Sequence, residues 1–168
     1  MPPKVRKAAL AIHLTVSVGW IGGVVAYLTL GLWAINTIDD QSIRAAWAAM
    51  DIIGWYAIVP LAVATLATGL LMALGTRWGL FRHYWVIISL ILTLIAVVVL
   101  LLHMPDVTAT AEFAANASGD QLADLGGDLA HPTIGLALLL VAHTLNLYKP
   151  KGLTRHGRRL QRQSHSEA

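Results

Sequence analysis

The chain has 168 residues, of which 57% are hydrophobic and only 12% are charged. Because soluble domains carry about 25% charged residues, this composition excludes an ordinary soluble protein. The formal net charge is +3, but the basic residues are sorted by loop and do not form one basic face, so nucleic acid is not an expected partner. There is no cysteine, so any metal ion would need nitrogen, oxygen or thioether ligands.

Four predominantly apolar stretches approach the roughly 20 residues that a helix needs to cross a bilayer. They cover residues 8–35, 45–74, 84–102 and 131–148. The first stretch is too long for a secretion signal and lacks a small-residue cleavage site, so we expect a retained helix. The sequence therefore predicts an all-α fold: one integral membrane four-helix bundle over residues 1–168, ending in a basic tail at 149–168.

The distribution of Lys and Arg predicts the orientation. Eleven of the twelve basic residues lie in the N-terminus, the short second loop and the tail, and Arg44 is the exception. Since basic flanks stay on the cytoplasmic side, both termini are expected in the cytoplasm of a protein of the cell membrane. The third loop, residues 105–130, is then external, with room for one short surface helix. Its acidic residues are Asp106, Glu112, Asp120, Asp124 and Asp128.

Histidines inside a membrane span are costly, so they are the first candidates for function. His13 lies six residues after Lys7 and His143 six residues before Lys149, which places both roughly 9 Å in from the same flank. Haem b takes two axial ligands, commonly imidazoles from different helices. We therefore predict His13 and His143 as the ligands of a haem iron.

The first helix offers a face for such a cofactor. His13, Ser17, Trp20, Val24 and Tyr27 recur at helical spacing and form one stripe that can face the bundle interior. Glycines on this helix, Gly23 among them, would let a neighbouring helix or a flat ligand approach closely. Ser17, Trp20 and Gly23 are accordingly predicted to line the haem slot.

A second pair of histidines lies at the opposite flank. His103 ends the third predicted helix and His131 begins the fourth, again at matching depths. With Met104 they offer the mixed imidazole and thioether ligands that suit copper. The competing interpretation of all these histidines is structural, in which each ring ties helices together through backbone carbonyls or hydroxyls such as those of Ser17 and Thr65.

Several short motifs resemble a group of small bacterial membrane proteins. The residues that carry the resemblance are His13 followed by Trp20, Gly22 and Gly23, then Pro60 with Thr68-Gly69, and then Thr76-Arg77-Trp78-Gly79-Leu80. The group includes the copper resistance protein D family, the haem-dependent membrane protoporphyrinogen oxidase family and a family of uncharacterised predicted integral membrane proteins, which the chain resembles most.

The resemblance to the oxidase family implies that His13 is a haem ligand and that Met50 corresponds to the family's second ligand. On depth, Met50 belongs to the outer flank, and His143 remains the preferred partner of His13. Where the family has a Lys after the second turn, this chain has Arg82-His83-Tyr84.

Three functions remain open at this point. The first is a haem b protein for electron transfer or membrane oxidoreductase chemistry, the second a copper-handling membrane protein, and the third a non-catalytic subunit or assembly factor. Candidate partners are the lipid bilayer, a redox partner or quinone, and either further copies of the chain or a larger membrane complex.

Overall fold

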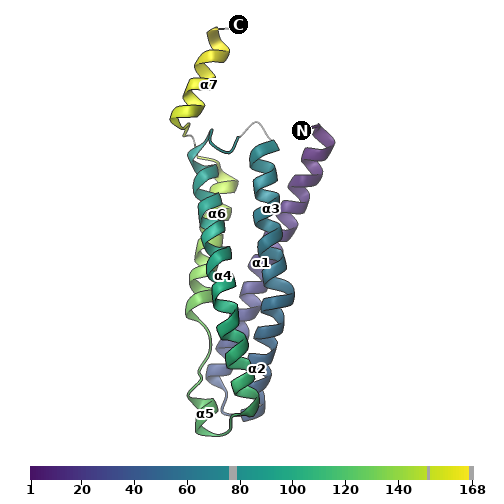
Figure 1. Ribbon diagram of the computed structural model, residues 1–168, viewed down its shortest axis with the longest axis vertical. Coiled ribbons are helices and arrows are strands. Elements are labelled where there is room, and N and C mark those ends of the chain that lie inside the picture. Colours follow the sequence, from purple (N-terminus) through teal and green to yellow (C-terminus); the bar gives the residue numbers. More distant parts are fainter. Residues whose placement is uncertain (76–78, 151, 167–168) are drawn as a thin grey trace.

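The computed structural model describes residues 1–75, 79–150 and 152–166, and they form an elongated bundle of helices (Figure 1). The elements, in chain order, are α1 (Pro3–Asn36), α2 (Asp40–Ile53), the π-helix η1 (Gly54–Ile58), α3 (Val59–Gly75), α4 (Tyr84–Asn116), α5 (Asp120–Ala123), α6 (Ala130–Tyr148) and α7 (Arg155–Ser166).

Four helical segments are long and apolar enough to cross a membrane: α1, the continuous run Asp40–Gly75, α4 and α6. The predicted all-α architecture with four candidate spans is confirmed. The outer surface of the bundle is apolar as well. On α4, for example, Ile91, Leu94 and Val98 are each between 45% and 49% exposed. Such a surface is unfavourable in water and is compatible with contact to a lipid bilayer.

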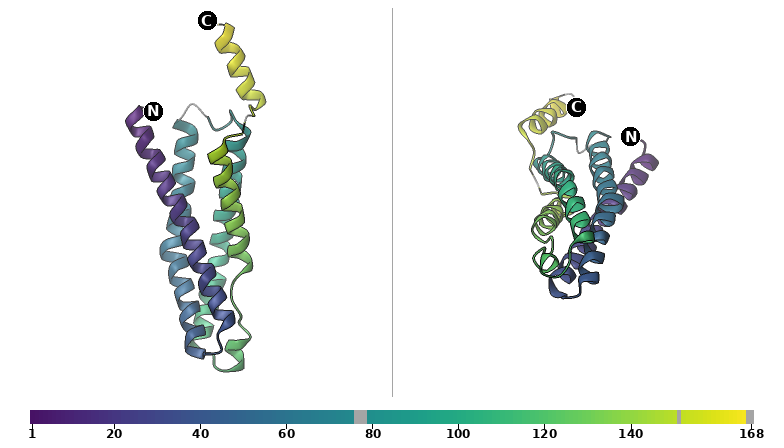
Figure 2. Two further views of the ribbon diagram at one scale, coloured as in Figure 1. Left: turned by 180° about the vertical axis from the view of Figure 1, so that it is seen from behind. Right: turned by 60° about the horizontal axis from the view of Figure 1, so that its bottom comes forward.

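Both chain termini lie at one end of the bundle, here called the terminal end (Figures 1 and 2). The opposite end, here called the loop end, carries α5 and the start of α2. At the terminal end, α7 is fastened to the segment before α4, because the Thr154 backbone N–H donates to the Arg82 carbonyl over 3.1 Å. The Thr154 hydroxyl also accepts from the Gly157 N–H at 3.0 Å and so caps α7.

The third membrane helix is longer than its sequence predicts. It was expected to end at Leu102, but α4 continues through Pro105 to Asn116. Pro105 removes one backbone donor, yet its ring lies on the exposed side of the helix. Beyond it, Val107 and Ala114 are 1% and 0% exposed, so burial against the bundle keeps this segment helical. About half of the predicted external loop is therefore helix, and α5 is the short surface helix expected there.

The second membrane helix changes its winding just before Pro60. Pro60 cannot donate to the carbonyl of Tyr56, so the α-helical ladder is already interrupted at this level. The chain takes a π turn over Gly54–Ile58, in which the Val59 N–H donates to the Gly54 carbonyl. The irregularity that Pro60 predicts is thus present as η1, ahead of the proline.

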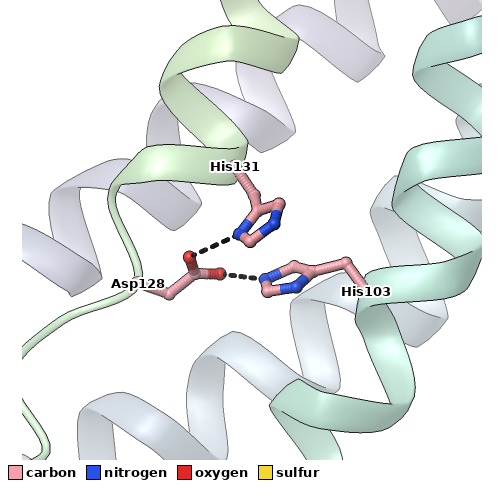
Figure 3. Close-up of side chains that lie close together, drawn as sticks. All are labelled: His103, Asp128 and His131. Atoms are coloured by element: carbon pink, nitrogen blue, oxygen red, sulfur yellow. Dashed lines mark hydrogen bonds and ion pairs between the residues drawn. The ribbon is translucent and has the colours of Figure 1, made fainter.

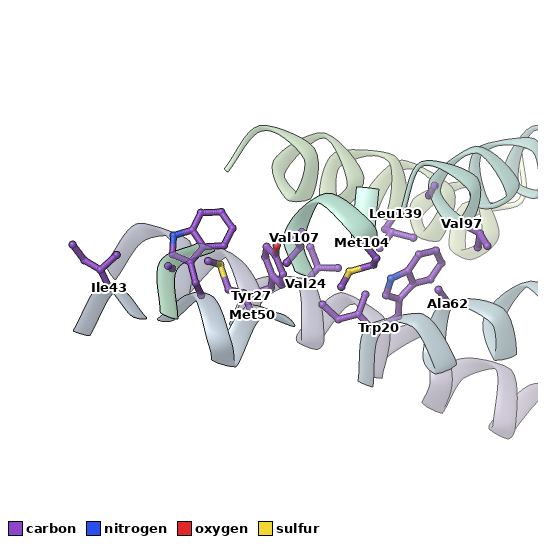
Figure 4. Packing of buried hydrophobic residues seen from close by; sticks show 14 of the residues in the cluster. Trp20, Val24, Tyr27, Ile43, Met50, Ala62, Val97, Met104, Val107 and Leu139 are labelled. Atoms are coloured by element: carbon purple, nitrogen blue, oxygen red, sulfur yellow. The ribbon is translucent and has the colours of Figure 1, made fainter. Parts of the chain in front are cut away.

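The main apolar core lies toward the loop end, where α1, α2 and α4 meet (Figure 4). Met50 and Met104 are 0% and 1% exposed. A Cβ on Gly54 would overlap the end of the Met104 side chain, so the absence of a side chain at Gly54 is what makes room for Met104. Met50 is therefore a core residue at the loop end, far along the bundle from His13.

The segment between α5 and α6 crosses directly over α1. A Cβ on Gly127 would overlap the backbone carbonyl of Gly31, and a Cβ on Gly31 would come within 2.9 Å of the Asp128 carbonyl. Two glycines facing one another thus allow backbone to touch backbone. This close approach brings Asp128 against α1, and it positions the site described below.

We predict that Gly127→Ala destabilises the protein, because the new methyl group must push the segment away from α1. Overpacking of this kind costs about 1–3 kcal/mol. The matched control is Gly22→Ala, where a Cβ meets nothing within 4 Å. At this helical position alanine is expected to stabilise by up to about 1 kcal/mol. Thermal unfolding of the three proteins in detergent measures the difference, and equal midpoints for Gly127→Ala and Gly22→Ala would contradict the prediction.

Candidate metal centre

Three side chains of types that can bind a metal ion converge in the half of the bundle nearer the loop end (Figure 3). His103 comes from α4, Asp128 from the segment before α6, and His131 from the first turn of α6. His103 Nε2 lies 2.6 Å from Asp128 Oδ2, and His131 Nδ1 lies 3.8 Å from Asp128 Oδ1. One nitrogen from each histidine and one carboxylate oxygen all lie within 4.8 Å of one another.

The two imidazoles stack on each other, with ring centroids 3.8 Å apart and an angle of 22° between the planes. Burial differs across the cluster. The Asp128 side chain is 9% exposed and that of His103 18%, whereas that of His131 is 53% exposed. The site therefore has a buried acidic side and an accessible imidazole side.

Tyr27 fixes the buried carboxylate from a third helix. Its hydroxyl donates to Asp128 Oδ2 over 2.8 Å, and the ring is 4% exposed. The same oxygen contacts His103 Nε2, so Oδ2 takes part in two short hydrogen bonds. A buried carboxylate needs such partners to offset its lost hydration. Asp128 thus joins α1, α4 and the start of α6 at one point.

The three side chains form a hydrogen-bonded cluster that a metal ion could enter once the stacked rings turn so that a nitrogen of each faces the ion. Imidazole and carboxylate ligands suit zinc, copper, iron and nickel. With bonds of about 2.0–2.2 Å, ligand atoms around a tetrahedral ion stand roughly 3.3 Å apart. His103 Nε2 and Asp128 Oδ2 are closer than that because a proton lies between them. An entering ion would replace this proton and move the two atoms apart by less than about 1 Å.

A cavity of about 320 Å³ adjoins the cluster. Its walls come mainly from α1, α4 and α6 and are almost entirely apolar, with Trp20 and Leu139 among them. His103, Asp128, His131 and Tyr27 line the same cavity and supply its polar groups. The ligand cluster is therefore accessible from an apolar space inside the bundle.

The predicted inner ligand His13 lies toward the other end of the bundle. Its Nδ1 lies 2.9 Å from the hydroxyl of Thr68, which in turn donates to the Ala64 carbonyl at 2.7 Å. When the threonine hydroxyl donates to the carbonyl, His13 Nδ1–H is the tautomer that donates to that hydroxyl. In the neutral ring, the lone pair is then on Nε2. Gly69 leaves room for this ring, since a Cβ there would come within 3.3 Å of His13 Cε1.

The rings of His13 and His143 are both partly buried. Of the other predicted slot residues, Ser17 donates to the Leu14 carbonyl of its own helix at 3.1 Å. Gly23 packs against Ile58, and Trp20 lines the cavity of the loop end. Their assignment to a haem slot stays a prediction.

The second predicted histidine pair, His103 and His131, is in contact in the structure, but the surrounding residues differ from the prediction. His103 lies within α4, thirteen residues before the helix ends, and His131 lies at the start of α6 as expected. The Met104 side chain packs against Gly54, and Asp128 completes the cluster in place of the thioether. Sequence reasoning recognised Asp128 only as one of several loop acids. The missed signal was its spacing of three residues before His131 at a helix start.

Comparison with protein-family models, with curated proteins and with solved structures finds no match. The resemblance in the inner motifs therefore stays a prediction, and its Thr76, Arg77 and Trp78 lie outside the described residues. His13 and Thr68-Gly69, two further parts of that resemblance, are in contact with each other.

We predict that Tyr27→Phe lowers the free energy of unfolding by about 1.5–3 kcal/mol, the usual contribution of a hydrogen bond to a charged group. The phenylalanine keeps the packing of the ring but leaves Asp128 without one donor. Tyr56→Phe is the matched control, because Tyr56 is 82% exposed. Thermal or denaturant unfolding in mixed micelles compares the two variants. A Tyr27→Phe protein as stable as the control would show that the hydroxyl contributes nothing at this position.

Proposed function

We propose that this chain is an integral membrane protein that binds a divalent transition-metal ion through His103, Asp128 and His131. The observation that supports this proposal is the convergence of three ligand atoms within 4.8 Å from three separate parts of the chain. Two imidazoles and a carboxylate form a donor set for borderline metals, and copper(II) is the first ion to test. Zinc fits the same donor set.

The arrangement favours exchange of the ion over a purely structural role. Structural sites commonly close four protein ligands around the metal, whereas three protein ligands leave a position open. Here His131 is 53% exposed and the cavity adjoins the cluster. An ion can reach the site only from the exposed side of His131, whereas the apolar cavity admits uncharged ligands.

We further propose that the terminal end faces the cytoplasm of the cell and that the metal centre lies toward the outer face of the membrane. The charges support this orientation. Lys4, Arg6 and Lys7 begin α1, and four arginines of α7 lie at the same end of the bundle. Basic flanks of this kind are retained on the cytoplasmic side.

Copper(II) titration of the purified protein, monitored by electron paramagnetic resonance, tests the metal site. The protein is isolated through a tag without histidine, so that the tag itself binds no copper. We expect one ion per chain, with hyperfine structure from two imidazole nitrogens. His103→Ala and Asp128→Asn should each weaken binding by about tenfold or more, since each removes one of the three ligands. His156→Ala, at an exposed tail position, is the control.

Binding should also weaken when the medium is acidified from about pH 7.5 to about pH 5, because histidine and carboxylate ligands coordinate in their deprotonated forms. Protons and the ion compete for the same nitrogen and oxygen atoms, so a lower pH favours the metal-free protein. Equal binding by the wild type, His103→Ala and His156→Ala would overturn the proposal, as would a spectrum without nitrogen coupling.

A haem b between His13 and His143 is a second candidate, in which the chain would be an electron carrier or membrane oxidoreductase. Two observations favour it. Thr68 directs the lone pair of neutral His13 to Nε2, the nitrogen that ligates iron in most haem proteins, and Gly69 clears space beside the ring. Bound haem would supply one-electron chemistry, and these residues would hold and orient it.

An absorption spectrum of protein expressed with added haem precursor tests this second candidate. We expect a Soret band that shifts on reduction and is lost in His13→Ala. The matched control is His103→Ala, which removes an imidazole at the other end of the bundle and should retain the band. A wild-type spectrum without a Soret band would remove haem from consideration and leave the outer metal site unaffected.

A further inference from the structure

The cavity at the loop end has the properties of a ligand site that is entered from within the membrane. At about 320 Å³ it falls at the lower end of the range for small-molecule sites. Of the residues that line it, Ile95, Val99 and Ile134 are 45%, 43% and 62% exposed. Side chains at its rim thus also reach the lateral surface of the bundle, so a molecule dissolved in the bilayer can enter sideways.

The polar groups of the cavity are few and clustered. His103, Asp128, His131 and the Tyr27 hydroxyl meet at one place, and the remaining walls are apolar. A matching ligand therefore has one hydrogen-bonding group and an otherwise apolar body. The Trp20 indole, 2% exposed, contributes an aromatic surface that favours a flat ring.

The negative charge of Asp128 at the polar end of the cavity further restricts which lipophilic molecules can bind. Without a bound ion, a phosphate or carboxylate head group would stand beside the Asp128 carboxylate, which is unfavourable and argues against phospholipids and fatty acids. A neutral hydroxyl or carbonyl group can instead donate to the carboxylate, or accept from an imidazole N–H.

We propose that this cavity binds a neutral, lipid-soluble ring bearing carbonyl or hydroxyl groups, that is, a quinone or quinol, with its oxygen facing His103, Asp128 and His131. The inference shares these three side chains with the proposed metal site and deepens that function, because the oxygen would face the open position of a bound ion. The apolar walls bind the ring whether or not the ion is present.

Gly135 offers a way to fill the cavity without replacing a residue of the polar cluster. It lines the cavity one turn after His131, and a Cβ built on it meets nothing within 4 Å. Leucine at this position would therefore occupy cavity space without displacing the α6 backbone. Gly22 on α1 is the matched control, since a Cβ there also meets nothing within 4 Å and this residue does not line the cavity.

The experiment titrates the full-length protein in detergent with 2-methyl-1,4-naphthoquinone and follows quenching of tryptophan fluorescence. This probe cannot form thiol adducts here, because the chain has no cysteine. 2-Methylnaphthalene, with the same ring skeleton and no oxygen, is the control ligand. We expect saturable binding of the quinone. The control ligand should bind about tenfold or more weakly, because it offers no oxygen to the polar groups of the cavity. Gly135→Leu should weaken quinone binding by a similar factor and Gly22→Leu should leave it unchanged.

Three outcomes would overturn the inference. Equal affinity for the two ring compounds would mean a nonspecific apolar space of the kind a lipid tail fills. Equal affinity in Gly135→Leu and wild type would place any binding outside the cavity. Tighter binding of decylamine than of the quinone would identify a site for cationic amphiphiles. Copper titration of Gly135→Leu separates the two proposals, since this variant keeps all three proposed metal ligands. Quinone binding without any copper binding would refute the metal proposal alone.

Discussion

The buried carboxylate of Asp128 is the constraint around which the loop end is built. A carboxylate with 9% exposure inside an apolar bundle must be compensated, and Tyr27 and His103 do so from two different helices over 2.8 and 2.6 Å. Removal of either partner would leave the charge under-solvated. The spacing of α1, α4 and α6 at this end is therefore tied to a single side chain, which also supplies the third ligand of the candidate metal centre.

Two features of the backbone make this arrangement reachable. Gly31 and Gly127 allow the segment before α6 to touch α1, and without that approach Asp128 would not meet Tyr27. The continuation of α4 past Pro105 places His103 well inside a helix, with helical turns before and after it. The site is thus held by helices and by a tightly packed crossing, which suits a group of ligands that must keep a fixed geometry.

The sequence predicted the parts of the fold that depend on hydrophobicity and length. The four apolar stretches correspond to the four candidate spans. The matching depths predicted that His103 and His131 lie near each other, and their rings stack. It did not predict the helical stretch beyond Leu102, because a proline and five acids are typical of a loop, and burial of Val107 and Ala114 decides otherwise. It also could not reveal the role of Asp128, since that role depends on contacts with Tyr27 and His103, which are distant in sequence.

The candidate centre and its neighbouring cavity lie in the half of the bundle nearer the loop end, and the hydrogen bond of His13 to Thr68 lies nearer the terminal end. The central claim is that His103, Asp128 and His131 hold an ion. Crystals of the protein grown with copper(II) and measured at the copper absorption edge test it most directly. We predict one anomalous peak about 2.0–2.2 Å from a nitrogen of each histidine and from an oxygen of Asp128. A peak elsewhere in the chain, or no peak in copper-saturated crystals, would contradict the account.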